Sequence, residues 1–197
     1  MHQVYFVRHG ETVWNVENKI CGATESPLTA RGREQARAIG RELRARMDAG
    51  ELKLDRMLCS PLSRARDTAE EIANILELPL AVDVRLREQN FGKWEGTARD
   101  GEGFQRAKEN FIDSFSGGES MMRVAQRIIS WMSSGKRRTQ AIFWSRTTAS
   151  PALWSPTFAT WKTRNSHPSE FGMQRSAPTA FPKRDESPNR GKMPDCA

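Results

Sequence analysis

The branched aliphatic residues of this 197-residue chain lie almost entirely in its first two thirds. Residues 1–129 contain 24 Ile, Leu and Val, whereas residues 130–197 contain two, Ile142 and Leu153. A segment with so few branched aliphatics cannot bury enough apolar surface to offset the entropy that ordering costs. The sequence therefore predicts one folded domain over residues 1–129 and a mostly disordered or loosely packed tail over residues 130–197.

The tail also differs from the first part in charge and in residue types. It holds 11 basic and 4 acidic residues, and so carries the whole net charge of +7, together with 4 of the 6 Trp and 7 of the 10 Pro. Residues 1–129 balance 20 basic against 20 acidic residues. Scattered Trp beside Arg, Ser, Thr and Pro is typical of a coding segment read in the wrong frame, so a frameshift is one interpretation and an ordinary flexible tail is the other. The only strand-like run in the tail is residues 141–144.

Several classes of protein are not expected. No run of about 18 apolar residues occurs, so no membrane span is predicted. The first eight residues turn polar too early for a secretory signal. The three cysteines, Cys21, Cys59 and Cys196, are far apart and form no CxxC pair, which predicts a reducing cytoplasmic setting rather than disulfides or a metal cluster. The basic tail carries no nucleic-acid-binding motif, so no nucleic-acid partner is expected.

Strands and helices are expected to alternate along residues 1–129. Short apolar runs predict three buried strands, at residues 3–7, 54–59 and 80–84. Capping residues and apolar stripes predict four helices: residues 30–47 after the N-cap Thr29, residues 61–76 with Ser60 as N-cap and Pro61 in the first position, and about residues 103–113 and 119–132. This alternation predicts an α/β domain with a largely parallel sheet.

Arg8, His9 and Gly10 follow the first predicted strand directly, at the edge of the sheet where α/β proteins bind ligands. Gly10 would let the backbone approach a ligand closely, and Arg8 offers a planar fork for phosphate oxygens. A neutral ring nitrogen of His9 can attack phosphorus and carry the phosphoryl group, and a nearby arginine favours the neutral ring. The alternative interpretation is a strand-end Arg-His pair on a solvated turn.

Two further side chains are predicted at the same edge. Arg64 lies in the first turn of the helix after the second strand, and the N-terminus of a helix itself attracts phosphate. Glu88 follows the third strand, where a carboxyl group could protonate a leaving alkoxide. The alternatives are a surface arginine and a surface salt-bridge partner. We expect Arg66 to be solvated and Phe91 and Trp94 to pack in the interior.

The order of these residues resembles that of the histidine phosphatase superfamily, also called the phosphoglycerate mutase-like family, over roughly residues 3–129. The segments that match are Arg8-His9-Gly10-Glu11, Asn15, Gly22, Pro27-Leu28-Thr29, Ser60-Pro61-Leu62-Ser63-Arg64-Ala65, Leu86-Arg87-Glu88 and Gly117-Gly118-Glu119-Ser120. The resemblance implies a three-layer α/β/α sandwich with a mostly parallel sheet, incomplete at its C-terminal end.

The resemblance also implies roles for individual residues. His9 would accept the phosphoryl group, Arg8 and Arg64 would hold the phosphate, and Glu88 would act as the general acid and then as the base for water. The residues implied to bind the substrate are Arg8, Gly10, Glu11, Asn15, Cys21, Gly22, Thr24 and Arg64. No metal and no cofactor are implied. The expected partner is a small phosphorylated metabolite, with no nucleic acid and no membrane, and a homodimer is left open.

One residue of the family pattern has no counterpart. Family members carry a second pocket histidine after a late apolar strand, but this chain has only His2, His9 and His167, and no apolar strand precedes His167. We therefore expect low or absent activity, and a missing inner strand would leave unpaired backbone and poor solubility. Residues 91–96 resemble the phosphatase branch, which predicts a phosphomonoester hydrolase. The alternatives are mutase-type phosphoryl transfer and a catalytically impaired remnant that binds phosphorylated ligands.

Overall fold

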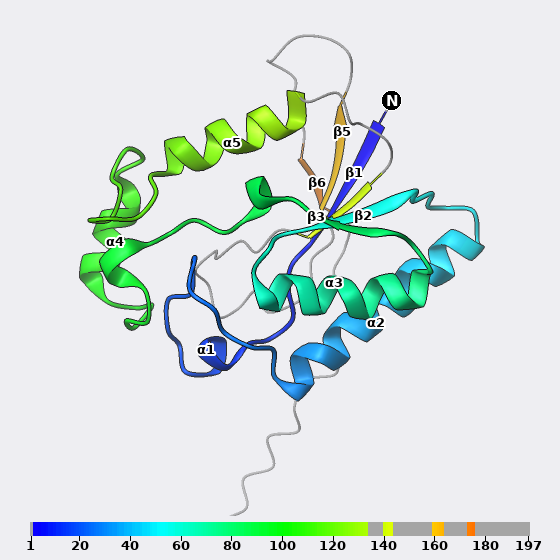
Figure 1. Ribbon diagram of the computed structural model, residues 1–197, viewed down its shortest axis with the longest axis horizontal. Helices are drawn as coiled ribbons and strands as arrows, with labels where there is room; N and C mark the ends of the chain where they lie inside the picture. Colours follow the sequence, from blue (N-terminus) through cyan, green and yellow to red (C-terminus); the bar gives the residue numbers. More distant parts are fainter. Residues whose placement is uncertain (1, 134–139, 144–158, 164–172, 176–197) are drawn as a thin grey trace, which may run out of the picture.

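The computed structural model describes residues 2–133, 140–143, 159–163 and 173–175. Its strands are β1 (His2–Val7), β2 (Arg56–Cys59), β3 (Leu80–Val82), β4 (Gln140–Phe143), β5 (Ala159–Thr163) and β6 (Met173–Arg175). Its α-helices are α1 (Val13–Val16), α2 (Ala30–Asp48), α3 (Ser63–Leu76), α4 (Glu102–Glu109) and α5 (Met121–Ser133), and two 3₁₀ turns are η1 (Val84–Leu86) and η2 (Gly92–Trp94). The α/β class is thus confirmed (Figure 1).

The strands form one mixed sheet in the order β3-β2-β4-β1-β5-β6. The pairs β2/β3, β2/β4 and β1/β4 are parallel, whereas β5 runs antiparallel to both β1 and β6. β4 comes from the segment that composition assigned to the tail, yet it lies inside the sheet, between Arg56–Cys59 on one side and Val4–Val7 on the other. β4 thus occupies an inner position of the sheet, and the expectation that the sheet is incomplete at its C-terminal end stays a prediction. A strand of only four residues can hold this inner position because the backbone groups of both neighbouring strands provide hydrogen-bonding partners for it.

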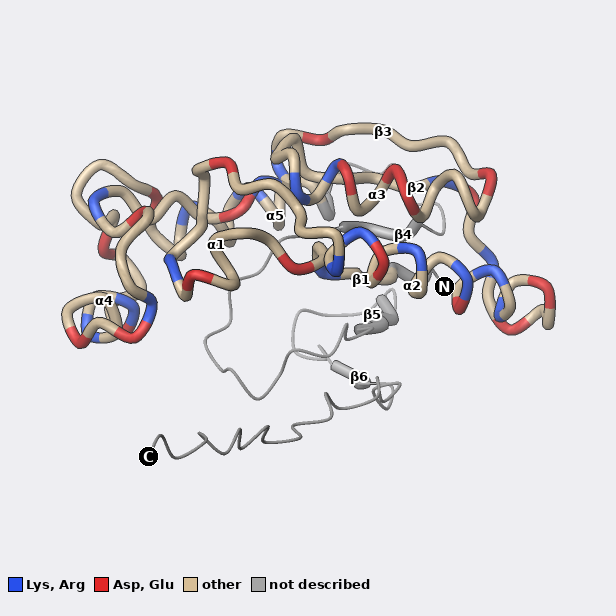
Figure 2. Tube along the Cα trace, turned by 90° about the horizontal axis from the view of Figure 1, so that it is seen from below, with Lys and Arg blue, Asp and Glu red and all other residues tan. Residues whose placement is uncertain are grey.

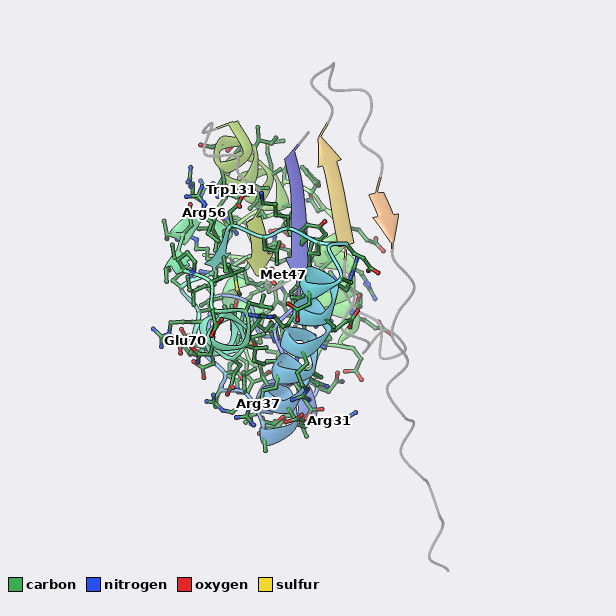
Figure 3. The ribbon with its side chains drawn as sticks, turned by 90° about the vertical axis from the view of Figure 1, so that its right-hand side faces the viewer. Arg31, Arg37, Met47, Arg56, Glu70 and Trp131 are labelled. Carbon is green, nitrogen blue, oxygen red and sulfur yellow. The ribbon has the colours of Figure 1, made fainter. Side chains whose placement is uncertain are left out.

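Helices cover both faces of the sheet, which confirms the three layers. On one face Tyr5, Val7 and Met57 pack in a core with the apolar stripes of α2 and α3. On the other face Phe6 and Leu58 pack with α5. This division follows from the strands, whose successive side chains point to opposite faces. Met47 of α2 and Trp131 of α5, both labelled in Figure 3, belong to the two opposite cores.

α2 follows the sequence prediction closely. Thr29 caps it, because its hydroxyl accepts the N–H of Gly32 at 3.0 Å. The predicted stripe is buried at Ala36, Ile39, Gly40 and Leu43. Acidic and basic residues are interspersed along α2 and α3 (Figure 2), and Arg33 and Arg37 of α2 pair with Asp67 and Glu71 of α3. The two helices therefore pack together through buried apolar residues and exposed ion pairs.

The start of α3 corrects the prediction. The helix begins at Ser63 with Leu62 as its N-cap, and not at Pro61 after Ser60. Leu62 has no side-chain capping bond. Instead the backbone N–H and the hydroxyl of Ser63 both donate to the carboxylate of Glu25. A carboxylate from a distant loop thus supplies the capping acceptor, which local sequence signals do not predict.

A third apolar cluster lies beside the sheet and contains Ile20, Phe91, Phe104 and Phe115, with Trp94 packed against it. This confirms the expected packing of Phe91 and Trp94. In the described part of the chain, no helix is long and apolar enough to cross a membrane.

Candidate active site

His9 lies at the carboxyl edge of the sheet, two residues past the end of β1. β1, β4 and β2 run parallel in register, so the chain leaves the sheet at the same edge after Val7 and after Cys59. α3 follows β2 after a short turn, and Arg64 lies in its first turn. The charges of Arg64 and Arg8 both act on the His9 ring. The fold thus brings these three side chains together at the edge where α/β sheets bind ligands, as the sequence predicted.

The backbone after His9 fixes the tautomer of its ring. Nδ1 lies 2.6 Å from the carbonyl oxygen of Gly10. Because a carbonyl oxygen only accepts hydrogen bonds, Nδ1 carries the proton. In the neutral ring Nε2 then holds the lone pair, which is the arrangement that a nucleophilic histidine needs.

The surroundings of His9 favour that neutral ring. Burial lowers the pKa of His9 well below its ordinary value, and the charges of Arg64 and Arg8 lower it further. The hydrogen bond to Gly10 acts in the opposite direction but does not reverse the shift. The His9 ring is therefore neutral at neutral pH, with its one proton on Nδ1.

Gly10 couples the loop after β1 to two helices. Its N–H donates to Oγ1 of Thr68 in α3 at 3.1 Å, and Oγ1 of Thr68 donates to the carbonyl of Arg64 at 2.8 Å. A Cβ on Gly10 would lie 2.2 Å from the carbonyl oxygen of Gly32 in the first turn of α2. Only glycine permits such an approach, so α2 and α3 together set the position of His9.

Arg64 is fully buried. Its Nη2 donates to the carbonyl oxygen of Gly22 at 2.6 Å, and its Nη1 donates to that of Thr24 at 2.9 Å. A buried guanidinium needs such acceptors to offset the loss of water. The two bonds also fix the plane of the side chain, so that a preoriented cation lies beside the nucleophile.

A third arginine, Arg99, adds to the positive charge of the site. Burial lowers the pKa of Arg8; the charges of Arg99 and Arg64 lower it further, while Glu88 raises it. Arginine remains charged at physiological pH, so three like charges act on one small region. A bound phosphate dianion would relieve this repulsion. Sequence reasoning missed Arg99, because it lies in a loop between motifs and no local pattern marks it.

Glu88 directly follows the turn after β3 and is 4% exposed. Its Oε1 accepts the N–H of Gln89 at 2.9 Å, and its charge acts on both Arg8 and the thiol of Cys21. The predicted general acid is thus a buried carboxyl group of the same site and not a surface salt-bridge partner.

The residues before and within α5 hold the Glu88 loop. Nε2 of Gln89 donates to the carbonyl of Glu119 at 2.8 Å. The carboxylate of Glu119 accepts two bonds of 2.9 Å from Arg127, whose Nη1 also donates to the carbonyl of Arg85 at 2.6 Å. This partly buried ion pair therefore connects α5 to the chain on both sides of Glu88.

Three of the remaining predicted substrate-binding residues lie around Arg64. Gly22 and Thr24 accept its hydrogen bonds, and Cys21 donates its thiol proton to the carbonyl of Thr24 at 3.3 Å. Burial raises the pKa of the Cys21 thiol to about 11, although the charge of Arg64 opposes the shift. The thiol is therefore protonated and adds no charge to the site.

Asn15 and Glu11 use their side chains in local structure. Oδ1 of Asn15 accepts the N–H and the hydroxyl of Thr12, at 3.1 and 2.9 Å, as part of the cap of α1. The carboxylate of Glu11 accepts the hydroxyl of Thr29 at 2.9 Å and lies 3.8 Å from Arg31. These contacts tie the loop after β1 to α1 and α2, and a substrate-binding role for either residue stays a prediction.

The second histidine expected from the resemblance is not placed by these observations, since His167 lies outside the described residues. Within the ranges that the structure describes, no three His, Cys, Asp or Glu side chains are grouped to hold a metal ion.

The α/β sandwich with a histidine and arginines at its carboxyl edge is that of a phosphoryl-transfer family. This chain belongs to the histidine phosphatase superfamily (branch 1), whose family model matches residues 4–142. The match runs past the boundary at residue 129 that composition suggested, and it includes most of β4.

Among curated relatives, the chain is similar to the probable phosphoglycerate mutase GpmB of Salmonella choleraesuis (strain SC-B67) and of Salmonella typhi, with 38% identity over 135 residues in each case. The alignment covers 65% of this chain and 60% of each relative. The chain thus matches less than two thirds of the length of these relatives.

Solved structures share the fold. A putative α-ribazole-5'-P phosphatase from Escherichia coli aligns with a TM-score of 0.68 at 20% identity, over 91% of this chain and 96% of that one. A mycobacterial glucosyl-3-phosphoglycerate phosphatase in complex with VO3 aligns with a TM-score of 0.69 at 23% identity, over 92% of this chain and all of that one. At these identities the likeness establishes the fold alone.

Proposed function

We propose that this chain hydrolyses phosphomonoesters of small metabolites through a phosphohistidine on His9. The observation that carries the proposal is the neutral His9 ring, with Nδ1 bound to the carbonyl of Gly10 and with Arg8 and Arg64 beside it. A neutral imidazole flanked by fixed cations has the chemistry to bind a phosphate dianion and to attack it.

The proposed reaction has two transfers. Arg8 and Arg64 hold the phosphoryl oxygens, and Nε2 of His9 attacks phosphorus while the bond to the leaving oxygen breaks. Glu88 donates a proton to that oxygen and then takes one from the water that attacks the phosphohistidine, which releases phosphate and restores the free ring. We expect turnover to be slow, since no second pocket histidine was identified in the sequence.

Mutase-type transfer is the second candidate, because the relatives with 38% identity carry the name probable phosphoglycerate mutase. Both reactions would use the same phosphohistidine and differ in whether water or a second hydroxyl accepts the phosphoryl group. Incubation with 3-phosphoglycerate separates them, since hydrolysis releases inorganic phosphate and transfer forms 2-phosphoglycerate.

The experiment compares phosphate release by the wild type, His9→Ala, Arg64→Ala and Arg66→Ala. Arg66 is an exposed arginine in the same helical turn as Arg64 and serves as the matched control. We expect no release with His9→Ala, a loss of about 10²- to 10³-fold in kcat/KM with Arg64→Ala, and no change with Arg66→Ala. Release that survives His9→Ala would refute the proposal. Phosphate binding with no release by the wild type would instead identify a catalytically impaired remnant.

A further inference from the structure

We infer that Glu95 is a positioning residue, which orients Arg64 by holding the loop formed by residues 22–24. The inference rests on the proposed function, in that Arg64 is the cation that binds phosphate. Glu95 belongs to the segment 91–96, which resembles the phosphatase branch of the family, and the steps of the proposed reaction do not involve it.

The carboxylate of Glu95 accepts backbone N–H groups from two separate segments. Oε2 accepts from Gly22 at 2.9 Å and from Thr24 at 3.3 Å. Oε1 accepts from Ala23 and from Phe91, each at 2.9 Å. One charged group thus satisfies three consecutive N–H groups of the loop and anchors them to the segment in which Glu95 itself lies. Hydrogen bonds of this charged kind are about twice as strong as those between neutral groups.

Arg64 binds the same loop through the backbone carbonyl groups of the loop. The carbonyl oxygens of Gly22 and Thr24 accept from its two terminal nitrogens, at 2.6 and 2.9 Å. The peptide groups of the loop therefore lie between the carboxylate of Glu95 and the guanidinium of Arg64. If the N–H side is released, the carbonyls can turn away and the plane of Arg64 is no longer fixed.

The fit around this loop is close. A Cβ on Gly22 would lie 2.4 Å from Oε1 of Glu95 and 2.2 Å from the carbonyl oxygen of Gln89. A side chain at position 22 would therefore push the loop off the carboxylate. The glycine that the sequence analysis assigned to the substrate is, in the structure, what lets Glu95 reach the backbone.

Glu95→Gln is the decisive substitution because it keeps the shape and changes only the acceptors. The amide oxygen can accept from one pair of N–H groups. The amide nitrogen would then face the other pair, and because both groups are donors, those hydrogen bonds cannot form. We expect Kd for inorganic phosphate and kcat/KM for p-nitrophenyl phosphate to worsen by about 10- to 100-fold. Amide hydrogen exchange of residues 22–24 should accelerate. Glu102→Gln is the matched control, since Glu102 is 85% exposed and pairs with Arg106 in the same helix.

The test is a double-mutant cycle with Arg64→Lys, read by phosphate binding as well as by turnover. If Glu95 acts through Arg64, Glu95→Gln costs several-fold less in the Arg64→Lys background than in the wild type. Glu95→Asp retains the charge but is too short to reach all four N–H groups, so it should also weaken phosphate binding. It replaces Glu95→Gln in the experiment if Glu95→Gln does not fold. Equal phosphate binding by both variants and the wild type, or additive losses in the cycle, would overturn the inference and leave the proposed function intact. A wild type that neither binds phosphate nor hydrolyses the ester would overturn both.

Discussion

The contact between Gly10 and α2 gives a prediction whose size follows from the structure. Gly10→Ala would place a Cβ 2.2 Å from the carbonyl oxygen of Gly32 and 2.7 Å from its carbonyl carbon. A carbon and an oxygen that are not bonded need at least about 3.3 Å, so the His9 loop and the start of α2 must separate by about 1 Å. Backbone shifts of this kind cost about 1–3 kcal/mol of folding free energy, and a displacement of about 1 Å at a nucleophile costs about 10²-fold in rate.

Gly10→Ala should therefore lower the thermal midpoint by several degrees and reduce kcat/KM for p-nitrophenyl phosphate by about 10²-fold. Gly101→Ala is the matched control, because a Cβ there meets only the carbonyl oxygen of Ala98, at 3.4 Å. Because Gly101 is the N-cap of α4, where alanine is less favourable than glycine, that variant should lose up to about 1 kcal/mol of folding free energy but keep the wild-type kcat/KM. If Gly10→Ala keeps the thermal midpoint of the wild type and a kcat/KM within twofold of it, then the contact with α2 does not set the position of His9.

Three other perturbations have expected outcomes in urea unfolding. Because the pKa of His9 is lower in the folded than in the unfolded protein, the unfolded state binds more protons as the pH falls below about 6.5. The free energy of unfolding of the wild type should therefore fall by up to about 1.4 kcal/mol per pH unit in that range, and that of His9→Gln should fall less. Parallel pH profiles for the two proteins would contradict this. Thr68→Val should cost about 1–3 kcal/mol, since it removes the acceptor of the buried Gly10 N–H; a cost under about 0.5 kcal/mol would count against that bond. Arg127→Met should cost about 2 kcal/mol, because it removes the charged hydrogen bonds to Glu119 while the 3.9 Å contact of Glu119 with Arg87 remains. Loss of an exposed pair costs under about 1 kcal/mol, and a cost that small for Arg127→Met would contradict the role given to it.

The parts of the site that follow from local sequence were predictable. Thr29 precedes a stripe with the period of a helix, and the structure has α2 starting where that pattern does. His9, Arg64 and Glu88 each follow a strand, and parallel strands end at a common edge, so their meeting follows from the chain order alone.

The supporting contacts could not be predicted because they join residues far apart in the chain. Glu25 accepts the N–H of Ser63 at the start of α3 from 38 residues away. Glu95 accepts N–H groups of a loop that lies more than 70 residues before it. No periodicity marks either residue. β4 was underestimated for a related reason, because a run of four residues is weak as a local pattern and becomes an inner strand only between β1 and β2.

The most direct test of the central claim is whether a phosphoryl group forms on His9. The protein is mixed with a phosphate ester, quenched in alkali within milliseconds to seconds, digested and examined by mass spectrometry for phosphate on the peptide that contains residue 9. We expect one phosphoryl group on His9, stable in alkali and lost in acid, and absent from His9→Ala. Hydrolysis of the ester with no phosphoryl group on His9 at any time point would rule out a phosphohistidine mechanism.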